Sequence, residues 1–118
     1  MSASGVEGFV AGLNQHGAEA ERDNEYVFYS VRGPRGPHQG KIIRTAVAVA
    51  ELAAWPAMPP HWVQFPAAVQ LESPNPDQSQ TAPGYTRHSR SFEAWERVTD
   101  PTQAWLAHVR FVLGSALA

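Results

Sequence analysis

The residue best suited to proton transfer in this sequence is His88, which lies between two arginines in a polar stretch. The positive charges of Arg87 and Arg90 should depress the pKa of His88 and favour the neutral imidazole, the form that accepts a proton. A neutral imidazole activates a nucleophile when the two groups lie within hydrogen-bond reach. The chemistry of this candidate base therefore depends on the nucleophile that the fold brings to it.

The nucleophiles available to His88 are hydroxyls, because the 118 residues include no cysteine. Thiol and thioester chemistry is excluded for them, together with disulfides and zinc–thiolate sites. A serine activated by a histidine could instead carry an acyl group as an oxyester. Neighbouring side chains point apart in an extended chain, so Ser89 is a poor partner for His88. Hydroxyls in this part of the chain belong to Ser79, Thr81, Ser89 and Ser91, of which Ser79 is the candidate nucleophile.

The same segment has two non-catalytic interpretations. In the first, its cationic side chains pair with the carboxylates of Glu93 and Glu96 and pin a loop across a sheet. In the second, it is a recognition surface, because aromatic and arginine side chains are common anchors of protein interfaces. The absence of cysteine agrees best with recognition. The binding residues would be Tyr85, Arg87, Arg90 and Trp95, beside His88.

Composition argues against several other kinds of partner. Nine basic and eleven acidic side chains give a formal charge of −2, which offers no general attraction to nucleic acid or anionic lipid. The other histidines are scattered without metal-ligand spacing, so we expect no metal and no cofactor. The longest apolar run, residues 46–50, is too short to cross a bilayer of ~30 Å, and residues 1–8 do not resemble a secretory signal. We therefore expect a cytoplasmic protein with a protein partner.

Periodicity predicts one α+β domain over residues 1–118. Apolar residues at positions 6, 9, 10 and 13 follow helical spacing and predict a helix over about residues 4–20, with Ser4 as its N-cap. Residues 25–32 and 41–50 are rich in aromatic and β-branched types and predict an antiparallel hairpin around the Gly/Pro-rich loop 33–40. Residues 61–65 predict a third strand.

A long loop and a helix complete the predicted chain. Residues 72–90 are poor in apolar side chains and predict a long loop, which in a compact domain is usually functional or mobile. Asp100, followed by a proline and by Gln103 three residues on, is typical of a helix start. The apolar face of this helix should pack on the sheet. It consists of Trp105, Leu106, Val109, Val112, Leu113 and Ala116.

Three short motifs resemble the ubiquitin-conjugating (UBC-like) family. Residues 55–62 (Trp-Pro-Ala-Met-Pro-Pro-His-Trp) resemble its tyrosine-proline-x-x-proline-proline signature, and residues 73–75 (Ser-Pro-Asn) stand where it often has histidine-proline-asparagine. Residues 84–90, followed by Trp95, are similar to an arginine-histidine and tryptophan segment of prokaryotic family E. The order helix, strand meander, Pro-Pro turn, irregular segment and helix is also that of the family's fold, over about residues 9–113.

The resemblance assigns a role to Asn75, since the family's asparagine steadies the oxyanion as a lysine attacks. The sequence also departs from the family's pattern. Pro83 occupies the position of the family's cysteine, so no thioester forms there. Residues 73–77 also fit a proline-stiffened turn in which Asn75 caps its own backbone.

The resemblance implies a non-thioester component of a bacterial ubiquitin-like conjugation or antiviral defence system. It would act as an adaptor, a carrier-binding subunit or an oxyester variant, with the modifier or its activating enzyme as partner. The alternative is a stand-alone protein-binding module, such as an immunity or regulatory protein, whose small α+β fold is coincidentally similar. A hydrolase using His88, a loop serine and Asp77 ranks last, since no strand-to-helix nucleophile elbow is present. Whether any reaction is catalysed, the partner's identity and the oligomeric state stay open at the level of sequence.

Overall fold

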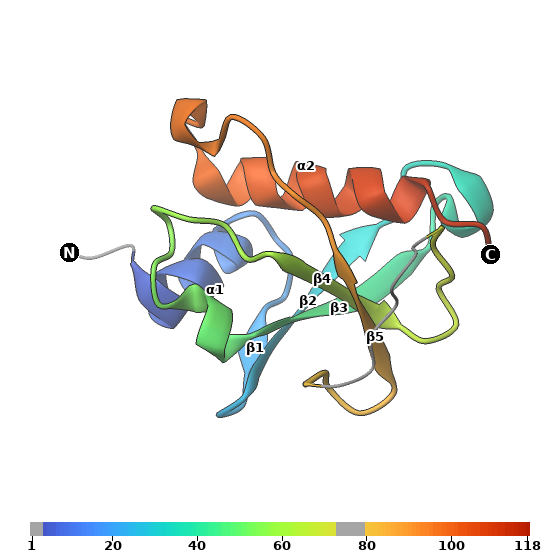
Figure 1. Ribbon diagram of the computed structural model, residues 1–118, viewed down its shortest axis with the longest axis horizontal. Helices are drawn as coiled ribbons and strands as arrows, with labels where there is room; N and C mark the ends of the chain where they lie inside the picture. Colours follow the sequence, from blue (N-terminus) through green and yellow to red (C-terminus); the bar gives the residue numbers. More distant parts are fainter. Residues whose placement is uncertain (1–3, 73–79) are drawn as a thin grey trace.

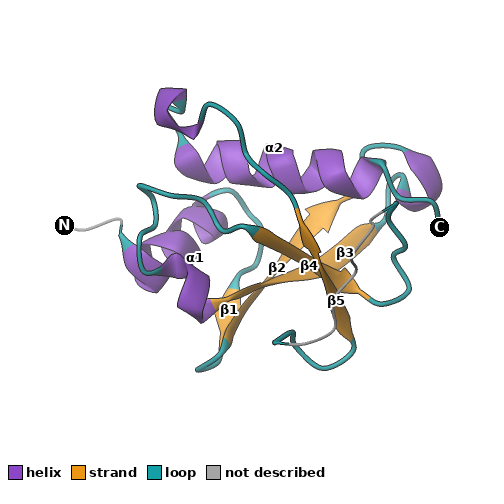
Figure 2. Cartoon of the chain, viewed as in Figure 1, coloured by secondary structure: helices purple, strands orange, loops and turns teal. Residues whose placement is uncertain are grey.

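Two helices cover one face of a five-stranded antiparallel sheet in the computed structural model, which describes residues 4–72 and 80–118 (Figure 1). The strands follow one another as a meander in the order β1-β2-β3-β4-β5, and both helices lie on the same side of the sheet (Figure 2). The predicted α+β arrangement of helix, antiparallel meander and C-terminal helix is thereby confirmed. The elements are α1 (Gly5–Gln15), β1 (Glu21–Arg22), β2 (Tyr26–Arg32), β3 (Ile42–Ala48), β4 (Trp62–Pro66), β5 (Tyr85–Ser89) and α2 (Pro101–Gly114), with 3-10 turns at Gly36–His38, Val49–Leu52 and Trp95–Arg97.

The central hairpin forms as predicted from the β-branched and aromatic runs. Strands β2 and β3 pair antiparallel along their whole length, from Tyr26 opposite Ala48 to Arg32 opposite Ile42. The connecting Gly/Pro-rich loop folds back toward the C-terminus, where His38 Nε2 lies 3.0 Å from the carbonyl oxygen of Ala118. The loop therefore closes one end of the space between the sheet and α2.

The first helix is shorter than the predicted span of residues 4–20. Phe9 and Leu13 are buried, as the helical spacing requires, but α1 ends at Gln15. Gly17 then adopts a positive φ of 75°, a conformation in which glycine carries no steric penalty. The chain consequently reverses direction before residue 20 and enters the short edge strand β1, which sequence reasoning did not predict.

The most consequential error of the sequence prediction concerns residues 72–90. They were expected to form a loop, yet Tyr85–Ser89 form β5, paired antiparallel with β4. The inward residues of β5 are Thr86 and His88, which are buried although neither is hydrophobic. A hydrophobicity pattern cannot detect a strand whose buried side chains are polar.

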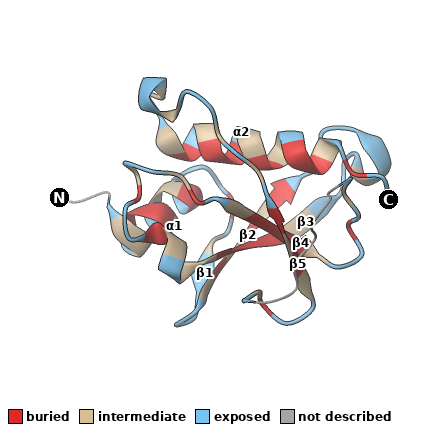
Figure 3. Ribbon diagram, viewed as in Figure 1, coloured by how far each residue is buried: buried red, intermediate tan, exposed pale blue. Residues whose placement is uncertain are grey.

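The C-terminal helix carries the predicted cap and apolar face. The Asp100 side chain accepts a hydrogen bond from the backbone N–H of Gln103 at 3.1 Å. The buried stripe of α2 then packs on the sheet, as the red inner surfaces in Figure 3 show. Trp105 is the centre of this contact, and its Nε1–H donates to the Tyr29 hydroxyl at 3.0 Å. Within residues 4–72 and 80–118, no helix is long and apolar enough to cross a membrane.

Candidate functional site

The alternation of β5 divides the predicted site residues between two environments. Thr86 and His88 face the helices, whereas Tyr85, Arg87 and Ser89 face the opposite, outer side of the sheet. The predicted opposite orientation of His88 and Ser89 is thus confirmed. The proposed grouping of His88 with Tyr85 and Arg87 on one surface is wrong, because the sheet separates them.

The sequence predicts that His88 lies in a polar loop. In the structure, His88 lies in the core and is 2% exposed. Neither of its ring nitrogens has a hydrogen-bond partner in the described part of the chain, and the Phe65 ring lies 6.4 Å away. Burial lowers the pKa of His88, and the positive charge of Arg90 lowers it further. The imidazole is therefore neutral at pH 7, but no hydroxyl of the described residues hydrogen-bonds to it, so its role as a base stays a prediction.

Asn75 and Ser79, the other two candidate catalytic residues, lie outside the described residues. Their proposed roles stay predictions, as does the turn expected around residues 73–77. The site can be built only from the two described segments that flank them.

The outer face of the sheet carries a cluster of aromatic and arginine side chains. The Arg87 guanidinium lies 3.9 Å from the centre of the Trp62 ring, in cation–π contact. The Tyr85 hydroxyl donates to the carbonyl oxygen of Arg44 at 3.1 Å, and the Tyr85 ring lies 5.9 Å from that of Phe28. We call this group the outer-face cluster. It comprises Tyr26, Phe28, Arg44, Trp62, Tyr85 and Arg87, brought together from β2, β3, β4 and β5.

A hollow of about 570 Å³ lies beside the outer-face cluster. Its walls include Tyr26, Trp62 and Arg87 from the cluster, together with Gln64. Gln64 is 1% exposed and its Oε1 accepts a hydrogen bond from the backbone N–H of Ala82 at 3.1 Å. Its Nε2 has no partner in the described part of the chain. Gln64, a wall residue of the hollow, thus has a buried donor that lacks an acceptor among the described residues, a costly arrangement unless a ligand supplies one.

Arg90 and Trp95 lie elsewhere, on the segment between β5 and α2. Arg90 donates to the carbonyl oxygens of Ser89 at 2.7 Å and Glu72 at 3.3 Å, so its observed partners are carbonyls and not the expected Glu93 or Glu96. Trp95 Nε1–H donates to the carbonyl oxygen of Pro56 at 2.8 Å. The predicted binding residues therefore form two separate pairs, Tyr85 with Arg87 and Arg90 with Trp95.

Sequence reasoning missed one pair of chemically active residues, Ser89 and His61. The register of β4 and β5 sets Trp62 opposite Ser89. His61 immediately precedes Trp62, the first residue of β4. The Ser89 hydroxyl and His61 Nε2 form a hydrogen bond. No local pattern signals this contact, because the two residues are 28 positions apart.

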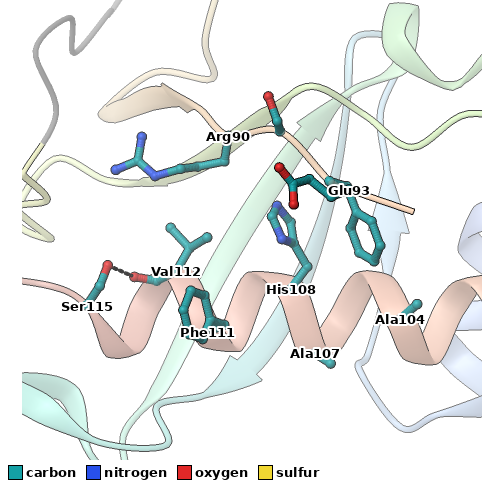
Figure 4. Close-up of a pocket in the computed structure, with 10 residues that line it drawn as sticks. Arg90, Glu93, Ala104, Ala107, His108, Phe111, Val112 and Ser115 are labelled. Carbon is teal, nitrogen blue, oxygen red and sulfur yellow. Dashed lines mark hydrogen bonds between the residues drawn. The ribbon is translucent and has the colours of Figure 1, made fainter. Parts of the chain in front are cut away.

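A groove of about 530 Å³ runs between the segment carrying Arg90 and helix α2 (Figure 4). Its wall includes Phe111, a large side chain that is 66% exposed. His108 points from α2 toward this segment, and its Nε2 is buried without a hydrogen-bond partner in the described residues. Burial lowers the pKa of His108, and Arg90 lowers it further. Residues 4–72 and 80–118 contain no group of three acidic or histidine side chains that could hold a metal ion.

Comparison with known proteins identifies no relative: no family model, no curated protein and no solved structure matches this chain. A functional proposal therefore depends on the residues and their geometry.

Proposed function

We propose that this chain is a cysteine-less, protein-binding UBC-like domain that uses the outer face of its sheet to hold an extended segment of a partner protein. The observation that carries this proposal is the outer-face cluster beside a hollow lined by Gln64, whose buried Nε2 has no acceptor among residues 4–72 and 80–118.

The side-chain types of the cluster are those that dominate binding energy at protein interfaces. Tryptophan, tyrosine and arginine are enriched among residues whose truncation costs an interface 2 kcal/mol or more. Trp62, Tyr85 and Arg87 are half-buried within one connected group, which limits the entropy that each side chain loses on binding. The outer face thus offers a preorganised aromatic and cationic surface.

Gln64 indicates the chemistry of the bound segment. Its Oε1 is occupied by the Ala82 N–H, so the amide orientation is set and Nε2 is left as a donor without an acceptor among the described residues. A backbone carbonyl of an extended peptide supplies the missing acceptor, and the adjacent Trp62 and Tyr26 rings accommodate an apolar side chain. The occupant is accordingly a peptide segment of another protein.

A nucleic acid would be the other occupant of a sheet face with exposed aromatic rings. The charges around the hollow argue against it, because Glu25 and Glu51 also line the hollow. Arg44, the second arginine of the cluster, already forms an ion pair with Glu21 at 3.1 Å. The formal charge of −2 adds no attraction for phosphates.

The proposed biological setting is a bacterial ubiquitin-like conjugation or antiviral defence system. Support comes from the order of helix, meander and C-terminal helix, and from the motifs at residues 55–62 and 84–90. With proline at position 83 and no cysteine, the domain would serve as adaptor or carrier-binding subunit. The competing proposal is an immunity or regulatory module with an unrelated protein partner.

Calorimetric titration of the purified protein with a bacterial ubiquitin-like modifier and with its activating enzyme tests both proposals. We expect one of the two to bind, and Trp62→Ala to weaken the binding by roughly 30-fold or more, as removal of an interface anchor does. Phe111→Ala is the matched control, because Phe111 is an exposed aromatic residue on α2, away from the sheet's outer face.

The outcomes separate the alternatives. Equal weakening by Trp62→Ala and Phe111→Ala would contradict the assignment to the outer face. Binding of neither protein would contradict the conjugation setting. Binding of a single-stranded oligonucleotide that Trp62→Ala abolishes would replace the peptide with a nucleic acid.

A further inference from the structure

The pairing of β4 with β5 creates a hydroxyl–imidazole contact outside the outer-face cluster. Ser89 is the last residue of β5, and the backbone N–H of Arg90 continues the pairing by donating to the carbonyl oxygen of His61 at 3.2 Å. This bond holds the two chain segments together next to the Ser89–His61 side-chain contact. Both side chains belong to exposed residues, so a solute can reach them.

A carboxylate holds the backbone that carries His61. Glu51 Oε1 accepts hydrogen bonds from the backbone N–H groups of His61 at 2.8 Å and Trp62 at 3.2 Å. The His61 ring also lies edge-on to the Trp62 ring, with 5.3 Å between centres. Glu51 is thereby a positioning residue, which acts on His61 through the backbone.

A hollow of about 420 Å³ adjoins the imidazole. Its apolar wall includes Met58, Phe92 and Trp95, and Arg90 lines it beside His61. The planar guanidinium of Arg90 has five N–H groups, so its two bonds to carbonyl oxygens leave further donors near the hollow. The hollow therefore offers room for a small apolar group and a positive charge for a developing oxyanion.

We propose that Ser89 and His61 are a nucleophile and base that accept the acyl group of small activated esters. Ser89 Oγ attacks the carbonyl carbon of the ester while its proton passes to His61 Nε2. The bond from that carbon to the leaving oxygen then breaks, and the imidazolium returns the proton to the leaving group. Water attacks the resulting Ser89 oxyester with His61 again as base, which releases the carboxylic acid and restores both side chains.

This inference is independent of the proposed function, because neither Ser89 nor His61 belongs to the outer-face cluster. A purely structural hydrogen bond would produce the same contact without reactivity. The experiment must therefore measure covalent chemistry at Ser89 and not stability alone.

The first test is incubation of the protein with p-nitrophenyl acetate, followed by mass spectrometry of its peptides. We expect acetylation at Ser89, no acetylation there in Ser89→Ala, and roughly 10²-fold slower acetylation in His61→Gln, the factor typical of a lost general base. Ser115→Ala is the control, since Ser115 is an exposed serine at the C-terminal end of α2. Acetylation confined to amines, or unaffected by His61→Gln, would overturn the proposal.

The second test uses the absence of native cysteine, which makes an introduced thiol the only one in the protein. A histidine that activates a neighbouring thiol lowers its pKa and increases the thiolate fraction at pH 7 by about tenfold. Ser89→Cys should react with a disulfide reagent about tenfold faster than Ser115→Cys, and the additional change His61→Gln should remove the difference. Equal rates for all three proteins would show that His61 does not activate residue 89.

Discussion

At the scale of single residues, His88 is the side chain whose environment differs most from its sequence context. Its polar neighbours in the chain predict an accessible imidazole, yet the strand turns it into the core, where both nitrogens lack partners in the described residues. An unsatisfied buried polar group costs about 1–3 kcal/mol. His88 therefore destabilises the fold relative to an apolar side chain of similar size.

The depressed pKa of His88 predicts a loss of stability in acid. At pH values between the folded-state pKa of His88 and its ordinary value of 6.5, the imidazole binds a proton in the unfolded chain but not in the folded chain. The part of the folding stability that depends on His88 protonation is thus fully present above about pH 6.5 and is lost as the pH falls below it. His108, whose pKa is lowered by the same causes, adds to the effect.

The variant His88→Leu should therefore be more stable by about 1 kcal/mol at pH 7 and lose less stability between pH 7 and pH 5. Urea denaturation at both pH values measures this, with His38→Gln, at a half-buried loop histidine, as control. If His88→Leu lost as much stability between pH 7 and pH 5 as the unsubstituted protein, the loss of stability in acid would come from other groups.

At the scale of elements, the two helices approach closely where Gly12 of α1 meets Thr102 of α2. A Cβ atom at position 12 would lie 2.2 Å from Thr102 Oγ1 and 3.3 Å from Thr102 Cβ. Helix propensity favours alanine over glycine by about 1 kcal/mol, but overpacking typically costs about 1–3 kcal/mol. The glycine, which helix propensity alone disfavours, is what permits the helices to touch.

Gly12→Ala should consequently destabilise the protein, and Thr102→Ala should rescue it by removing the hydroxyl that clashes. A double-mutant cycle by thermal denaturation should give a coupling of about 1 kcal/mol or more between the two positions. Additive effects of the two substitutions would show that α1 shifts to accommodate the methyl group.

At the scale of the whole molecule, one buried hydrogen bond joins the sheet to α2 through the middle of the core. Tyr29 and Trp105 are both fully buried, and the indole N–H donates to the phenol oxygen. Burial raises the pKa of Tyr29 to about 12, so this hydroxyl stays protonated under physiological conditions. The pair aligns helix and sheet with a directional bond that apolar contacts lack.

Tyr29→Phe removes the acceptor and leaves the Trp105 N–H unpartnered in the core. We expect the free energy of unfolding to fall by about 1–3 kcal/mol, and the melting temperature by several degrees. Tyr26→Phe is the matched control, since Tyr26 is a half-exposed tyrosine of the same strand and should change stability by less than about 0.5 kcal/mol. Similar losses in both variants would contradict the special role of the Tyr29–Trp105 bond.

Features that depend on neighbours within a few residues could be predicted from the sequence alone. The helical spacing around Phe9, the cap at Asp100 and the hairpin formed by residues 25–32 and 41–50 all depend on local periodicity, capping or turn chemistry. These predictions placed both helices and two of the strands, and the alternation of residues 61–65 placed a third, β4.

The grouping of the candidate site residues follows from long-range strand pairing and could not be predicted from local patterns. Strand β5 buries Thr86 and His88, so its pairing with β4, and not a run of apolar residues, makes it a strand. That register turns His88 inward, sends Arg87 onto Trp62 and brings Ser89 to His61, 28 positions away. Such contacts depend on which segments pair and in what register, a choice made by the packing of the whole chain and not by any short stretch of it.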